Sequence, residues 1–287
     1  MRKALFAFLI CMMFVPALYA AENLVYTRDI AYDDEKLVKV ELDFGLGQIS
    51  MARGQGDYIA RIHGDYDADK FKVDVNYEID GDVGHLVVKV DKKRKLFDFG
   101  GDEDTENSWQ ILLGDMVPLE LIVDAGMAET NFNFTGLSVE NLSMDIGMAS
   151  GTMMFNQPNP VRMKQMVLDL GQSSMNIYGL GNANFEELNV DCGMSSVEMD
   201  FSGQADFDAL VTLEMGMSST EIVLNPVAGV QIDHDAGLTS SVDLPGSFQE
   251  VSKGVYQSAN YQKAPGRLDF KIDVGMGSVD FRLAKSL

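Results

Sequence analysis

The sequence predicts an all-β protein: a parallel β-solenoid with coils of about 22 residues, preceded by an N-terminal antiparallel β cap. Three observations predict this fold. One short phrase recurs along the chain, apolar and polar residues alternate around each copy, and turn-forming residues separate the copies. A short strand cannot bury its apolar side alone, so the coils are expected to stack and create the core between them.

The repeated phrase carries an acidic residue two positions before a glycine, with apolar residues on either side. Residues 191–199 read DCGMSSVEM and residues 214–222 read EMGMSSTEI. From the second copy onward, successive glycines are separated by 21, 24, 22, 23, 21 and 38 residues. We expect the glycines of all the copies to stack at one corner; they are Gly45, Gly126, Gly147, Gly171, Gly193, Gly216, Gly237 and Gly275.

The alternation identifies each coil as strands joined by corners. Leu188, Val190 and Cys192 share one side of a strand, but after Gly193 the apolar positions move to the other parity, starting with Val197. Such a change requires a bend, which glycine and the following serines can form. Further turn-forming residues supply a second corner, and parallel crossovers favour right-handed coils.

The chain divides into three predicted regions. Residues 1–20 have a basic start, an apolar run and a small residue at Ala20, the layout of a secretory signal peptide cleaved near Ala20 or Ala21. Residues 21–118 contain longer alternating runs and are expected to form the cap, and residues 119–287 form the solenoid. We expect the rung that contains Gly275 to close the stack, after a polar, tyrosine-bearing insertion.

Composition removes some classes of function. Without residues 1–20 the chain has 20 Lys and Arg against 44 Asp and Glu, so nucleic acid is not an expected partner. No further stretch is apolar enough to span a membrane once the signal segment is cleaved. Cys192 would be the one remaining cysteine, which excludes an intramolecular disulfide. In the cap, the basic run 92–95 and the acidic run 102–106 are expected to form a solvated loop that neutralises itself, with an anion site as the alternative.

The most regular polar feature is a predicted outward-facing column of carboxylates, two positions before the glycines. Neighbouring carboxylates about 5 Å apart repel by roughly 1 kcal/mol in water. Calcium could bind such a row, but we expect the carboxylates to accept backbone N–H bonds at the corners and stay solvated, without calcium-specific stabilisation. The column consists of Asp124, Asp145, Asp169, Asp191, Glu214, Asp235 and Asp273.

Other candidate residues are expected to be structural. The methionines that follow most of the glycines could bind Cu(I) through their thioethers, but we expect them to fill gaps in the core. Cys192 is expected to be a core residue, and His234 an inward, hydrogen-bonded residue rather than a metal ligand or acid–base group. His63 and His85 have no ligand-spaced partner. No catalytic, cofactor-binding or metal-binding residues are assigned, and no cofactor is expected.

Three stretches give the chain a resemblance to known families. VELDFGLGQISMARG opens the cap, WQILLGDMVPLELIVDAGMAETNFNFTGLSVENLSMDIGMASG enters the stack, and ANYQKAPGRLDFKIDVGMGSVDFRL ends it. These stretches resemble the toast-rack and LiaF-like (cell-wall-active-antibiotic response) families, with exported head-domain adhesin-like solenoids as a looser relative. The resemblance implies a non-enzymatic envelope protein, in some members tied to the sensing of envelope stress. The multi-span N-terminal region of LiaF-like membrane proteins has no counterpart here.

The sequence therefore favours an exported, non-catalytic interaction, scaffolding or adhesion module in the periplasm or at the cell surface. Its expected partner is an envelope protein or a glycan. The alternative is a β-helix enzyme that acts on polysaccharide. Such an enzyme needs basic groups or bound calcium to hold anionic sugar, and the basic residues after Leu119 are few and dispersed.

Overall fold

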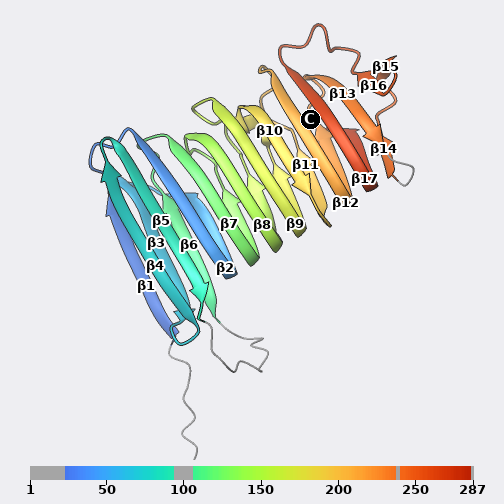
Figure 1. Cartoon of the computed structure of the whole chain (residues 1–287). Helices are drawn as coiled ribbons and strands as arrows, with labels where there is room; N and C mark the ends of the chain where they lie inside the picture. Colours follow the sequence, from blue (N-terminus) through green and yellow to red (C-terminus); the bar gives the residue numbers. More distant parts are fainter. Residues whose placement is uncertain (1–22, 94–105, 237–239, 286–287) are drawn as a thin grey trace, which may run out of the picture.

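The computed structural model describes residues 23–93, 106–236 and 240–285, and its strands lie side by side in one long rack (Figure 1). Six long strands form the regular part of the rack. They are β2 (Leu37–Arg53), β7 (Leu119–Asn133), β8 (Val139–Met154), β9 (Met163–Tyr178), β12 (Ala209–Leu224) and β17 (Arg267–Leu283). Their lengths of 15 to 17 residues make each of them most of one coil.

The long strands pair in parallel and in register, as a solenoid requires. β2 pairs with β7, β7 with β8, and β8 with β9. The next rung consists of β10 (Phe185–Cys192) and β11 (Ser196–Asp200), and both strands pair in parallel with β9 on one side and β12 on the other. The predicted all-β solenoid is therefore confirmed, whereas the hand of its coils stays a prediction.

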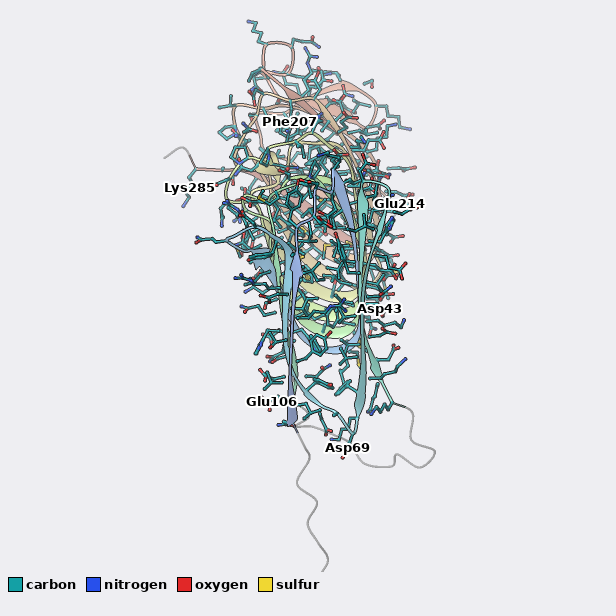
Figure 2. The ribbon with its side chains drawn as sticks, turned by 90° about the vertical axis from the view of Figure 1, so that its left-hand side faces the viewer. Asp43, Asp69, Glu106, Phe207, Glu214 and Lys285 are labelled. Atoms are coloured by element: carbon teal, nitrogen blue, oxygen red, sulfur yellow. The ribbon has the colours of Figure 1, made fainter. Side chains whose placement is uncertain are left out.

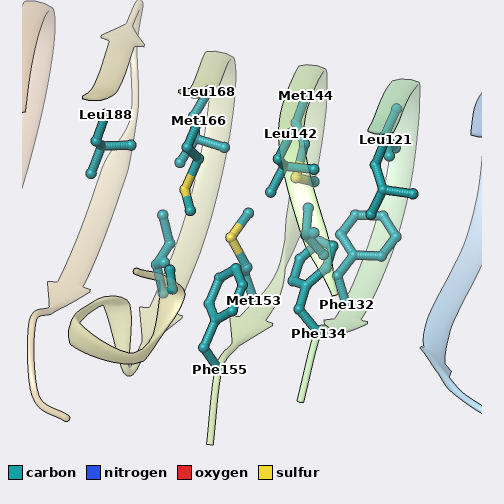
Figure 3. Close-up of a cluster of buried hydrophobic side chains, with 14 of the residues drawn as sticks. Leu121, Phe132, Phe134, Leu142, Met144, Met153, Phe155, Met166, Leu168 and Leu188 are labelled. Carbon is teal, nitrogen blue, oxygen red and sulfur yellow. The ribbon is translucent and has the colours of Figure 1, made fainter. Parts of the chain in front are cut away.

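Each rung bends at its glycine, which gives the rack two layers. We call the layer made by the strand halves before the glycines the first sheet, and the layer made by the halves after them the second sheet. Figure 2, seen from one end, shows these two layers with side chains between them. The core consists of inward side chains from both halves, such as Leu142, Phe132 and Phe155 (Figure 3). The rings of Phe134 and Phe155 stack with centroids 4.9 Å apart.

The stacked glycine column is confirmed within the described residues. A Cβ atom on Gly147 would lie 2.9 Å from the carbonyl oxygen of Gly126, and one on Gly171 would lie 2.7 Å from that of Gly147. The same relation continues through Gly193, Gly216 and Gly275. The bend therefore brings successive backbones too close for a side chain. Gly237 lies outside the described residues.

The N-terminal end combines parallel and antiparallel pairing. β5 (Val83–Lys92) and β6 (Asn107–Leu113) run parallel to the two halves of β2. β4 (Phe71–Asp80) pairs antiparallel with β5, β3 (Tyr58–Asp67) with β6, and β1 (Asn23–Ala31) with β3. The predicted antiparallel pairing thus holds for β1, β3 and β4.

Two expectations about this end remain untested. The sheet continues across residue 118 through the pairing of β2 with β7, and the division into cap and solenoid stays a proposal. Most of the basic and acidic loop, like the predicted signal segment, lies outside the described residues.

The C-terminal end differs from the expected order. β17 lies between β12 and the broken rung formed by β13 (Gly229–Ala236) and β14 (Ser240–Asp243), so it does not close the stack. The connection between β14 and β17 is long enough for the chain to return past the β13 and β14 rung and place β17 beside β12. The uninterrupted β17 pairs along the length of β12, and the irregular rung of β13 and β14 forms the edge of the rack. There the hairpin of β15 (Gln249–Ser252) and β16 (Val255–Gln257) covers part of β13, which protects an exposed edge.

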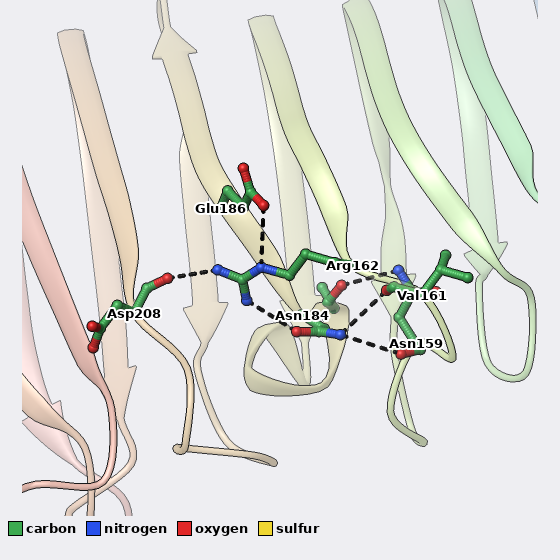
Figure 4. A network of polar contacts seen from close by, with 7 residues as sticks. Asn159, Val161, Arg162, Asn184, Glu186 and Asp208 are labelled. Atoms are coloured by element: carbon green, nitrogen blue, oxygen red, sulfur yellow. Dashed lines mark hydrogen bonds and ion pairs between the residues drawn. The ribbon is translucent and has the colours of Figure 1, made fainter.

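Asparagine side chains hold the second corner together (Figure 4). The buried Asn159 amide bonds to both the N–H and the C=O of Val139. Asn184, at the end of the short helix α1 (Leu180–Ala183), donates to the carbonyl of Val161 at 3.2 Å. Arg162 donates to Asn184 at 3.0 Å and to the carbonyl of Asp208 at 2.6 Å. These bonds satisfy backbone groups that the turns leave unpaired.

Candidate functional site

A row of carboxylates follows the outer face of the first sheet, next to the glycine corner. We call it the acidic row. Register places its members on successive rungs in the order Asp43, Asp124, Asp145, Asp169, Asp191, Glu214, Asp273 and Asp235. All are exposed except the half-buried Asp43, which confirms the predicted outward column. Asp43 and Glu214 mark the same outer side of the molecule in Figure 2.

The carboxylates of this row are not held by the corner backbone. Among the described residues, the one hydrogen bond to the row comes from Lys89 to Asp43, and it raises the pKa of Lys89. Partial burial raises the pKa of Asp169, and the charges of Asp145 and Asp191 raise it further. The expectation that these groups accept backbone N–H bonds is therefore wrong. The row is a line of mutually repelling, solvated charges.

The repulsion leads to a prediction for Asp169→Asn. A carboxyl whose pKa is raised by folding destabilises the fold when it is ionised, and this effect fades as the pH falls through that pKa. The substitution should raise the free energy of unfolding at pH 7 by about 0.5 kcal/mol, with the gain lost near pH 4. Urea unfolding at the two pH values measures this. Asp206→Asn, outside the row, is the control, and an equal gain in both variants would contradict the explanation.

The residues after the glycines form a second row along the corner, the methionine row. It comprises Leu46, Met127, Met148, Gln172, Met194, Met217 and Met276. The expectation that these methionines fill the core is wrong, since Met127, Met148, Met194, Met217 and Met276 are 47% to 51% exposed. At the bend the glycine and the next residue both face outward, and the inward positions resume one residue later.

The single candidates behave mostly as expected. Cys192 is fully buried, and burial raises the pKa of its thiol, so it is a core residue. His234 pairs in register with the buried Ile272, and its ring stacks on Tyr256 with centroids 5.5 Å apart. The predicted inward position is confirmed. The predicted hydrogen bond is not found at Nδ1, which is buried without a partner in the described structure.

One buried acid, Glu35, was not singled out from the sequence. Glu35 is 1% exposed, and its carboxylate accepts hydrogen bonds from the Tyr77 hydroxyl and, at 2.8 Å, from the Asp33 N–H. Burial raises the pKa of Glu35, but these bonds outweigh it and lower the pKa overall. Each oxygen of this buried carboxylate thus has a hydrogen-bond partner, and the residue stabilises the β1–β2 turn. It therefore has no free position for substrate.

The outer face of the second sheet carries a polar surface that sequence analysis missed. We call it the polar face. Near the N-terminal end of the rack its outward side chains are hydroxyls and amides. They are Gln48, Ser50, Ser108, Gln110, Asn131, Ser150, Thr152, Ser174 and Asn176, with His63 and Glu129 as the titratable members. Part of the signal was present in the repeat, because the members on β2, β7, β8 and β9 occupy the third and fifth positions after the glycines, whereas Ser108, Gln110 and His63 come from β6 and β3.

The polar face is hollowed. These side chains, together with buried Trp109 and Thr130, line a hollow of about 590 Å³ that crosses β3, β6, β2, β7, β8 and β9. Few of the side chains are tied to one another. Thr152 donates to Asn131 at 3.4 Å and Gln48 to Glu129 at 3.2 Å, while Ser174 and Asn176 make no side-chain hydrogen bond within the described structure. Many donors and acceptors are thus free to meet a ligand.

No metal centre or membrane span emerges from the described part of the chain. No group of three or more His, Cys, Asp or Glu side chains in residues 23–93, 106–236 and 240–285 is placed to hold a metal ion. Within the same residues, no helix is both long and apolar enough to cross a membrane.

Comparison with known proteins identifies the family. The model described as the N-terminal domain of toast_rack, DUF2154, matches residues 20–178, more than half of the chain. The chain belongs to this toast-rack family. The match includes β1 to β9, and so the whole polar face and the first four positions of the methionine row. The toast-rack part of the resemblance inferred from the repeated corners is confirmed, and the LiaF-like part stays a prediction.

Solved structures match most of the chain at low identity and with TM-scores below 0.5. A candidate cell adhesion protein from Clostridium sporogenes is 16% identical, with 92% of this chain and 100% of that chain covered and a TM-score of 0.49. A candidate adhesin from Bacteroides fragilis is 10% identical, with coverages of 91% and 99% and a TM-score of 0.38. A candidate lipid binding protein from Parabacteroides distasonis is 12% identical, with coverages of 90% and 96% and a TM-score of 0.32. No curated protein matches the sequence.

Proposed function

We propose that this toast-rack protein is an exported, non-catalytic interaction module of the cell envelope that binds neutral glycan on its polar face. The observation that carries the proposal is the hollow of about 590 Å³ lined by hydroxyl and amide side chains in a chain of net charge −22. Family membership supports the same class, because the toast-rack resemblance implies non-enzymatic envelope proteins.

The chemistry of the polar face favours sugar over the other expected partners. Sugar hydroxyls both donate and accept hydrogen bonds, as do Ser, Thr, Asn and Gln side chains. A protein-binding patch usually has a core of large apolar side chains, which the outward positions of this face lack. The acidic row and the overall negative charge would repel anionic polysaccharide.

Binding to neutral oligosaccharides tests the proposal. Glucan, mannan and N-acetylglucosamine oligomers of about five sugars are titrated against the protein by calorimetry, with oligogalacturonate as the anionic comparison. We expect at least one neutral series to bind and oligogalacturonate not to bind. Asn131→Ala combined with Asn176→Ala should weaken binding about tenfold, since each lost hydrogen bond contributes about 0.5–1.5 kcal/mol.

The matched control lies on the other sheet. Asn141→Ala combined with Asn189→Ala removes two partly exposed amides from the outer face of the first sheet and should leave glycan affinity unchanged. Absence of binding by every neutral series, or equal loss in both double variants, would overturn the assignment of the polar face.

Export is a separate prediction. The layout of residues 1–20 implies that expression in a bacterial host with a secretion pathway yields protein lacking the residues up to Ala20 or Ala21. Intact-mass measurement of protein recovered from the envelope fraction locates the new N-terminus. Protein that retains Met1 and stays in the cytoplasmic fraction would show the prediction to be wrong.

A further inference from the structure

Three consecutive positions of the methionine row carry thioethers. Met217 and Met276 are register partners on β12 and β17, and Met194 lies one rung before them. The backbone bond from the Met217 N–H to the Gly193 carbonyl, 2.7 Å long, fixes the position of Met194 relative to Met217. The exposed fractions of the three residues are 47%, 49% and 51%.

Packing does not account for this triplet. A buried methionine stabilises a fold through the apolar surface that it removes from water, and half-exposed side chains forgo much of that gain. The glycines beside the row leave open space: an apolar groove of about 480 Å³ follows the corner from Gly126 to Met194. Of the three methionines, Met194 lies at the end of this groove, while Met217 and Met276 lie beyond it on the same corner, half-exposed rather than inside a packed core.

The spacing suits a soft metal ion. Strands in a sheet are about 4.8 Å apart, and methionine has three rotatable bonds in its side chain, so three sulfurs on successive rungs can turn toward one ion. Thioethers are neutral, soft ligands that select Cu(I) among biological metals. Asp191, Glu214 and Asp273 of the acidic row lie on the same three rungs and attract cations to the corner.

We propose that Met194, Met217 and Met276 form a binding site for a soft monovalent cation, Cu(I). The site lies on the corner, away from the polar face, and does not depend on the proposed glycan function. The N-terminal part of the row provides the contrast. Met127 and Met148 are neighbours, but Leu46 and Gln172 flank them and end the run of sulfurs at two.

Silver(I), a redox-inert stand-in for Cu(I), tests the site. Both cysteines compete for silver, so the chain carries Cys11→Ser and Cys192→Ala throughout. Silver nitrate is titrated in chloride-free buffer, with calorimetry for affinity and methionine methyl NMR for position. We expect one high-affinity ion per chain and shifts of the Met194, Met217 and Met276 methyl signals.

Two matched variants decide the outcome. Met217→Leu keeps the side-chain volume and should lower the affinity at least tenfold, whereas Met148→Leu should leave it unchanged. Unchanged affinity in Met217→Leu would overturn the proposal. Loss of binding in Glu214→Gln but not in Met217→Leu would overturn it as well, because it would assign the ion to the acidic row.

Discussion

Gly171→Ala should lower the free energy of unfolding by about 3 kcal/mol, although it adds one methyl group. The new Cβ would lie 2.7 Å from the carbonyl oxygen of Gly147, and this contact is with backbone that cannot turn away. Relief requires the rungs of β8 and β9 to separate, which strains the hydrogen bonds between them. Chemical denaturation followed by circular dichroism measures the loss.

Gly246→Ala is the matched control for this effect. A Cβ at Gly246 meets nothing within 4 Å, and the backbone there does not have a positive φ. Alanine restricts the unfolded chain at both positions, so Gly246→Ala should be neutral or stabilising by up to about 1 kcal/mol. Equal unfolding midpoints for the two variants would contradict the close stacking of the glycine column.

Trp109→Ala should destabilise the N-terminal end of the rack by about 3–5 kcal/mol. Trp109 is 3% exposed, and its ring centroid lies 5.7 to 5.9 Å from the ring centroids of Tyr26, Phe44 and Tyr66. Its Nε1–H donates to the Asn107 side chain at 2.7 Å, and the substitution removes that partner as well. The absence of a side chain at Gly64 makes room for the ring.

The neighbouring residue supplies the comparison for the tryptophan. Gln110→Ala changes an exposed side chain on the same strand and should alter the free energy of unfolding by less than about 0.5 kcal/mol. Urea unfolding of both variants, followed by far-ultraviolet circular dichroism, measures the difference. A similar small effect for Trp109→Ala would mean that the aromatic cluster does not stabilise this end.

The repeat predicted the features that depend on spacing along one strand. Asp145 and Asp169 face outward on adjacent rungs because the sequence places both two residues before a glycine. Cys192 was placed in the core by the same comparison of positions. Whether these side chains face inward or outward follows from the alternation of apolar and polar residues along a strand, which a single sequence displays directly.

Features that depend on geometry at the bend or on chain order were not predicted. Met148 was assigned to the core because the sequence does not show at which residue of the bend the inward side switches between even and odd positions. In the structure this switch comes directly after Met148, which therefore faces outward. The position of β17 depends on which neighbouring rung can pair with it over more residues. The alternation within β17 itself does not show which rung that is. The polar face was missed because its neutral residues resemble ordinary solvated positions when they are read one at a time.

Crosslinking of serine positions tests most directly the claim that β17 lies between β12 and the broken rung. Met276 joins the proposed metal site only in that order. In the Cys11→Ser, Cys192→Ala background, Ser219→Cys is combined either with Ser278→Cys or with Ser241→Cys, and the reduced protein is then oxidised. Mass spectrometry counts the disulfides.

Ser219 and Ser278 are register partners on adjacent strands, within disulfide reach, so that pair should close. Ser241 pairs with Ser278 on its other side, two strands from Ser219, so the second pair should stay reduced. Closure of the Ser219 and Ser241 pair, with the Ser219 and Ser278 pair left open, would show that the rungs stack in sequence order and contradict the account.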